Sequence, residues 1–145
     1  MSPLLLIGLG NPLMGDDGIG WRVAERLAAD PRLPADAEAI CGGTDLLRCA
    51  AQIEGRRWVI LVDAVQDDAP PGTVSIIEED AMDLNREHAH HLSAGQAVKL
   101  LRLTMPVGFT LLGVSVQSAR MASELSPELA ARMPAILDRV IEELR

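Results

Sequence analysis

Five short apolar runs divide this chain into predicted strands. Residues 4–7 contain no polar side chain, a pattern typical of a strand in a parallel sheet whose two faces are both covered. Residues 58–62 form the clearest predicted strand, because they are apolar throughout and lead directly into an aspartate. The pattern predicts three further strands, at residues 37–41, 73–77 and 109–116.

Between the predicted strands, apolar residues recur at helical spacing. Ile19, Val23 and Leu27 share one face of a first helix, which we expect to end near Pro31. A second helix is predicted around residues 46–53, after a glycine-rich turn.

Two more helices carry recognisable start signals. Ser93 and Gln96 form a capping-box pattern that opens a third helix, which continues through Leu101. Ser126 and Pro127 begin the last helix. The residues that share its predicted apolar face are Leu129, Met133, Ile136, Val140 and Leu144.

Alternation of strands and helices over residues 1–145 predicts a single α/β domain. We expect a three-layer αβα sandwich around a mostly parallel, five-stranded twisted sheet. The polar residues 78–90 have no clear period and are predicted to form a loop. Right-handed crossovers between parallel strands would bring the ends of the first and third strands close together.

Composition narrows the class of protein. Of the 145 residues, 48% are hydrophobic but only 2% aromatic, so the predicted core is aliphatic. A net charge of −8 argues against a nucleic-acid partner. No apolar run reaches the roughly 18–20 residues of a membrane span, and no signal-peptide pattern is present, so we expect a cytoplasmic location. Cys41 and Cys49 are expected to be buried free thiols.

The loop after the first predicted strand is the strongest candidate site. Residues 8–20 read GLGNPLMGDDGIG, so that Asp16 and Asp17 stand where an open α/β sheet binds its ligands. The Gly8-x-Gly10 pattern alone would fit a dinucleotide-binding module, but the two acids occupy the place of its pyrophosphate. Because carboxylates repel phosphate, the loop is better suited to a cation.

Asp63 and a group of histidines extend this candidate site. Asp63 follows the third predicted strand and should lie at the same sheet edge as Asp17. His88, His90 and His91 fall in the polar loop. Two carboxylates and one imidazole would suit a divalent transition metal. The alternatives are that the acids only cap turns and that the histidines are solvated surface residues.

Five motifs resemble those of the hydrogenase maturation endopeptidases. They are residues 8–20, Gly-Gly-Thr at 42–44, Val-Asp-Ala at 62–64, Pro-Gly-Thr at 71–73 and His-His-Leu-Ser at 90–93. They occur in the family's order and span nearly the whole chain. The first motif is the most specific, because it combines glycines, an asparagine and acids.

This resemblance implies a particular set of metal-binding residues, which are Asp17, Asp63 and His90. Position 17 carries Asp where other family members have Glu, a shorter side chain that still supplies a carboxylate. Aligning His90 with the family's histidine keeps the following helix in register. His91 would shift the apolar face of that helix, and His88 lies too far from its start.

The resemblance also implies a function. Such enzymes remove the C-terminal extension of the large-subunit precursor of a nickel–iron hydrogenase after nickel insertion. The nickel belongs to the substrate, so we expect no permanent cofactor, and the group that activates the attacking water stays undetermined. We expect a monomer whose partner is that precursor, with Gly42, Gly43 and Thr44 as candidate substrate contacts.

One alternative enzyme class shares the opening motif. The Gly-Leu-Gly-Asn-Pro sequence at residues 8–12 also resembles the start of bacterial peptidyl-tRNA hydrolase. That family continues with a tyrosine, whereas this chain contains none. Asp16 and Asp17 would also repel an RNA backbone. Both departures favour the hydrogenase maturation endopeptidases.

Overall fold

The computed structural model describes residues 1–78, 94–117 and 121–145. Its strands are β1 (Leu4–Leu9), β2 (Ala37–Gly43), β3 (Trp58–Gln66), β4 (Val74–Ile76) and β5 (Gly108–Val116). Its α-helices are α1 (Ile19–Ala28), α2 (Ala50–Ile53), α4 (Ala94–Arg102) and α5 (Pro127–Glu143). Two short 3₁₀ helices, η1 (Gly15–Gly18) and η2 (Leu46–Cys49), precede α1 and α2.

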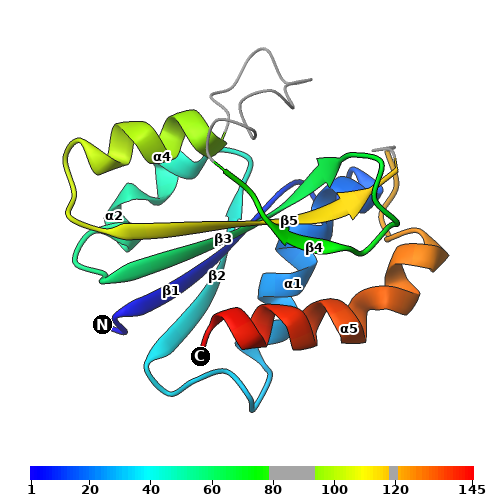
Figure 1. Cartoon of the computed structure of the whole chain (residues 1–145), viewed down its shortest axis with the longest axis horizontal. Helices are drawn as coiled ribbons and strands as arrows, with labels where there is room; N and C mark the ends of the chain where they lie inside the picture. Colours follow the sequence, from blue (N-terminus) through cyan, green and yellow to red (C-terminus); the bar gives the residue numbers. More distant parts are fainter. Residues whose placement is uncertain (79–93, 118–120) are drawn as a thin grey trace.

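The strands form one five-stranded sheet in the order β2-β1-β3-β5-β4. The first four strands in this order are parallel, and β4 pairs antiparallel with β5 at the edge (Figure 1). The expected mostly parallel sheet is therefore confirmed. Because β1 and β3 are neighbours, the segments that follow them meet at one edge of the sheet.

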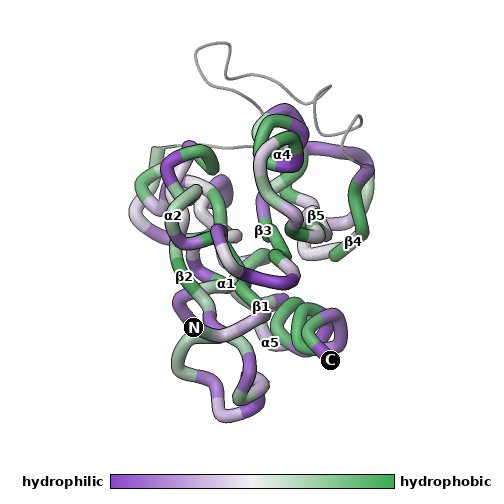
Figure 2. The backbone as a smooth tube through the Cα atoms, turned by 90° about the vertical axis from the view of Figure 1, so that its left-hand side faces the viewer, coloured by the Kyte–Doolittle hydropathy of each residue, from purple (hydrophilic) through white to green (hydrophobic). Residues whose placement is uncertain are grey.

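Helices cover both faces of the sheet, which confirms the three-layer sandwich. In Figure 1, α1 and α5 lie below the strands and α2 and α4 lie above them; Figure 2 shows the same separation of α4 from α5. Each layer has its own aliphatic core. All the apolar positions predicted for α1 and α5 are buried, namely Ile19, Val23, Leu27, Leu129, Met133, Ile136, Val140 and Leu144.

Several element boundaries differ from the sequence prediction, and three of them affect the candidate site. The third strand does not end at Val62 but continues to Gln66, because β5 pairs with it along its whole length. Asp63 therefore lies inside a strand instead of following one. Strand β2 likewise includes Gly42 and Gly43, and the second helix begins as the 3₁₀ helix η2.

Residues 79–93 lie outside the described residues, and so do residues 118–120. The predicted loop at residues 78–90 and the Ser93 cap thus stay predictions, although α4 itself is confirmed. Within the described part of the chain, no helix is long and apolar enough to cross a membrane.

Candidate functional site

The candidate site begins in the loop between β1 and α1. Gly20, in the first turn of α1, lies so close to the sheet that an added Cβ would be 2.2 Å from the Val62 carbonyl oxygen and 2.3 Å from that of Leu9. Gly10 adopts a φ of 121°, and its N–H donates to the Gly43 carbonyl over 2.8 Å. These glycines press the loop against the ends of β1, β2 and β3.

The two adjacent acids of the loop have different partners. Asp16 accepts hydrogen bonds from the backbone N–H of Ser126 at 2.7 Å and from its hydroxyl at 2.8 Å. Both of its carboxylate oxygens are thus used to hold the start of α5. Asp17 accepts the N–H of Asn11 on one oxygen only, at 3.2 Å. Asp16 therefore holds the fold, whereas Asp17 can still bind a further group.

Asp63 projects from β3 towards the α2 and α4 layer. Its strand neighbours Ile60 and Val62 belong to the core beneath α1 and α5, and Leu61 belongs to the opposite core. Because side chains alternate along a strand, Asp63 shares the face of Leu61. The Asp63 carboxylate accepts the N–H of Ala64 at 2.8 Å.

The electrostatics of Asp63 show that the two predicted carboxylates act on each other. Removal of the partly buried carboxyl from water raises the pKa of Asp63 to about 7, the hydrogen bond from Ala64 opposes the increase, and the negative charge of Asp17 adds to it. The structure therefore brings Asp17 and Asp63 together at the carboxyl-terminal ends of the parallel strands. Shifted carboxyl groups of this kind are concentrated at functional sites.

None of the three predicted histidines, His88, His90 and His91, lies within the described residues. The described chain resumes at Ala94, the first residue of α4, which packs on the Asp63 face of the sheet. Figure 1 shows α4 running opposite to β5, so its start points towards the ends of the parallel strands. In residues 1–78, 94–117 and 121–145, no three His, Cys, Asp or Glu side chains cluster as a metal site.

The candidate substrate contacts Gly42, Gly43 and Thr44 separate into two kinds. An added Cβ on Gly42 would lie 2.4 Å from Ile7 Cγ2, so this glycine is required by core packing. Gly43 has a φ of 71° and open space beside it, and Thr44 is exposed. Only Gly43 and Thr44 therefore offer a free surface at the edge where Asp17 lies.

The two cysteines are free thiols, as expected, and lie on opposite faces of the sheet; Cys49 is buried as predicted, but Cys41 is only partly buried. Cys41 packs against the core beneath α1 and α5, and Cys49 belongs to the other core. Burial raises the pKa of both thiols, and the neighbouring acids Glu25 and Asp45 increase the two values further. Neither thiol is therefore activated as a nucleophile.

Sequence reasoning missed the contacts that hold the Asp17 loop in place. Ala122 donates to the Leu13 carbonyl at 3.1 Å and accepts from Gly15 at 2.9 Å. Arg22 of α1 donates to the Ser123 carbonyl at 2.8 Å. The sequence predicted that Ser126 begins α5. It could not predict the contact with Asp16, because the two residues are 110 positions apart and no local pattern connects them.

Comparisons with known proteins agree on one family. A family model described as hydrogenase maturation protease matches residues 21–143. The Hydrogenase 2 maturation protease of Escherichia coli is 31% identical over 148 residues, covering 98% of this chain and 90% of that protein. The solved structure of the hydrogenase maturating endopeptidase HybD from E. coli has a TM-score of 0.82 at 32% identity, with 98% and 91% of the two chains covered. A hydrogenase 2 maturation peptidase from a Thaumarchaeota archaeon has a TM-score of 0.70 at 34% identity, with 97% of each chain covered.

Proposed function

This chain belongs to the hydrogenase maturation protease family, and we propose that it removes the C-terminal extension of a nickel–iron hydrogenase large-subunit precursor after nickel insertion. It is a peptidase, as its relatives are. In this proposal the nickel is part of the substrate and the protein has no permanent cofactor. The protein acts as a monomer on its precursor.

The observation that carries the proposal is the pair formed by Asp17 and Asp63. Both carboxylates lie at the carboxyl-terminal ends of the parallel strands, where burial raises the pKa of Asp63 and the negative charge of Asp17 adds to the increase. Two like charges in a partly buried place disfavour each other unless a cation lies between them. A nickel ion brought by the substrate would supply that positive charge.

His90 is the proposed third contact to the substrate's nickel, because mixed carboxylate and imidazole groups suit divalent transition metals. Contact with Asp17, Asp63 and His90 would fix the precursor relative to the protease, so that the bond to be cut is held in one orientation. Nickel in the substrate then acts as the signal that maturation is complete. Whether Asp63 contacts nickel or takes a proton from the attacking water, it must be ionised.

The test is the mass of a purified large-subunit precursor before and after incubation with this protein. We expect the nickel-loaded precursor to lose its C-terminal extension and the nickel-free precursor to stay intact, even at high protease concentration. Preincubating the protease alone with nickel should not restore cleavage of the nickel-free precursor. Efficient cleavage of nickel-free precursor, or of unrelated peptides, would contradict the proposal.

A further inference from the structure

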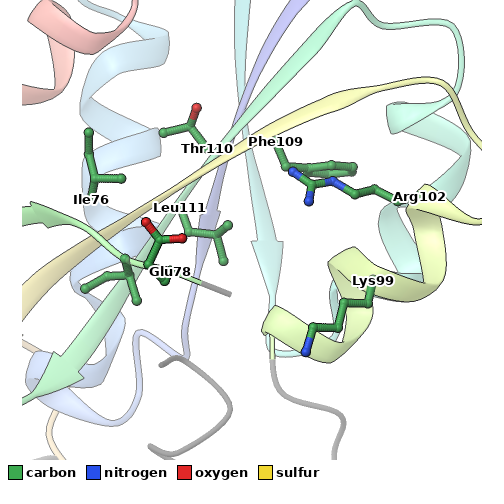
Figure 3. A pocket seen from close by; sticks show the side chains of 8 residues that line it. Ile76, Glu78, Lys99, Arg102, Phe109, Thr110 and Leu111 are labelled. Atoms are coloured by element: carbon green, nitrogen blue, oxygen red, sulfur yellow. The ribbon is translucent and has the colours of Figure 1, made fainter. Parts of the chain in front are cut away.

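A cavity of about 480 Å³ opens between β4, β5 and α4. None of the candidate site residues is among the residues that line it. Figure 3 shows Phe109 and Leu111 of β5 on its floor and Lys99 and Arg102 on the α4 side. The Arg102 guanidinium lies over the Phe109 ring, 5.7 Å from its centroid. Glu78 lies on the opposite, β4 side. The cavity thus combines an apolar floor with walls of opposite charge.

The outer edge of β4 borders this cavity and can accept another strand. Among the described residues, β4 pairs with β5 alone. Ile77 donates to the Leu111 carbonyl at 2.8 Å, so the alternating antiparallel pattern turns the N–H and C=O of Ile76 outwards. Ile76 is 57% exposed. Proteins usually protect such edges with charged residues or proline, and an exposed isoleucine there favours strand addition.

This edge lies close to the carboxylate pair. Asp63 pairs with Gly113, two residues beyond Leu111 on β5. A rise of about 3.3 Å per residue and a strand spacing of about 4.8 Å place Asp63 roughly 8 Å from Leu111 on β5 and roughly 10 Å from Ile76 on β4. An extended peptide bound at Asp63 would reach the cavity within about three residues. Asp63 and Leu111 also share one face of the sheet, so no helix separates them.

We propose that the outer edge of β4 and the adjoining cavity bind the precursor's extension as an added strand, with aliphatic and acidic side chains entering the cavity. The inference rests on the proposed function. The aliphatic side chains would cover Phe109 and Leu111. The cations Lys99 and Arg102 stand out in a protein of net charge −8 and favour an acidic side chain on the α4 side, whereas Glu78 disfavours one on the β4 side.

The first test removes one outward-facing donor of the edge. Ile76→Pro eliminates the backbone N–H without touching the bonds between β4 and β5, because proline is tolerated where a strand's N–H faces outwards. We expect KM for nickel-loaded precursor to increase about tenfold and kcat to change less than twofold. Ile76→Val keeps the N–H, so its KM should increase less than that of Ile76→Pro. An unchanged KM in a folded Ile76→Pro variant would overturn the strand-addition proposal.

The second test reverses the charge of the cavity wall. Arg102→Glu and Lys99→Glu should each increase KM about fivefold, and Arg26→Glu, on the exposed surface of α1, should not. Because Arg102 stacks on Phe109, circular dichroism and thermal unfolding should first confirm that the three variants are folded. With a nickel-loaded precursor whose extension ends two residues after the cut, KM should already be high and insensitive to Arg102→Glu. Equal sensitivity of the shortened and full precursors would overturn the assignment of this cavity to the extension.

These outcomes are separable from failure of the proposed function. If the unmodified protein does not process nickel-loaded precursor, the proposed function is wrong, and with it the inference that depends on it. If processing occurs but the Ile76, Lys99 and Arg102 variants leave KM unchanged, only the binding surface is wrong.

Discussion

The two helical layers differ in what they contribute to the molecule. The layer of α1 and α5 is tightly closed onto the sheet, since Gly20 touches two strands through its backbone and Asp16 fastens the start of α5. The layer of α2 and α4 has one short helix, contains the cavity, and lies on the face from which Asp63 projects. One layer is therefore closed onto the sheet, and the other leaves room for the proposed site.

The loop between β1 and α1 connects these two layers through neighbouring residues. Asp16 turns to Ser126 and belongs to the closed layer. Asp17 is bonded through one oxygen to Asn11 and interacts electrostatically with Asp63. Asp16 therefore contacts the α1 and α5 layer, whereas Asp17 interacts with Asp63. Substitutions can test whether the two layers have these separate roles.

The largest expected effect is the loss of activity in Asp63→Asn. The amide keeps the size of the side chain but removes the charge, so precursor processing should fall about 10²–10³-fold. Thermal stability should be unchanged or higher, because no charge is then taken from water. Asp67→Asn is the matched control, since its amide oxygen can still accept the Ala69 N–H. If Asp63→Asn processed the precursor normally, the proposed role of Asp63 in the reaction would be wrong.

How much of this division could be predicted from the sequence also differs between the layers. The burial of Ile19, Val23 and Leu27 was predictable, because helical periodicity reports directly which face of a helix is buried. The position of Asp63 inside β3 was not, because apolar periodicity stops at Val62 and the last four residues are held by pairing with β5. Strand pairing between distant segments leaves no local signal.

For the site, the family resemblance already pointed to Asp17 as the metal-binding acid of the loop, but only the structure shows what Asp16 does. Asp16 and Asp17 are identical side chains in adjacent positions, and a distant residue, Ser126, decides which of them is occupied. The cavity beside β4 was also unpredictable, since it depends on the antiparallel register of β4 and β5. The contribution of His90 stays a prediction.

The next largest effect concerns stability in the closed layer. Gly20→Ala should reduce the free energy of unfolding by about 3 kcal/mol, because the new methyl group would overlap two backbone carbonyl oxygens that cannot move aside. Gly43→Ala should cost only about 1 kcal/mol, since it meets open space and only its positive φ is unfavourable. Urea denaturation measures both. Equal losses would show that close packing of α1 on the sheet is not what distinguishes this layer.

The third effect is a pH dependence that arises at Asp63. Its carboxyl is neutral in the folded, metal-free protein below a pKa of about 7, whereas the unfolded chain ionises near the ordinary value of 3.8. Between these values the folded state binds more protons, so its stability decreases as pH rises and levels off above about 7.

Compared with Asp63→Asn, the unmodified protein should therefore lose on the order of 2 kcal/mol of stability between about pH 5 and pH 8. This figure is below the full shift because the side chain is only partly buried. Urea titrations of both proteins at the two pH values measure the difference, and other titrating groups cancel in the comparison. Parallel pH profiles would show that Asp63 is ionised in the folded protein throughout this range.

The smallest effect tests whether the two layers are independent. Ser126→Ala removes the side-chain cap of α5 and one of the two donors to Asp16, which should cost about 1 kcal/mol of stability. Because Asp16 keeps the backbone N–H of Ser126, the loop should hold Asp17 in place and kcat should change less than about threefold. Ser126→Thr restores the hydroxyl and should recover the stability. A tenfold loss of kcat at a temperature where Ser126→Ala is fully folded, with recovery in Ser126→Thr, would show that the start of α5 positions Asp17 and that the closed layer takes part in catalysis.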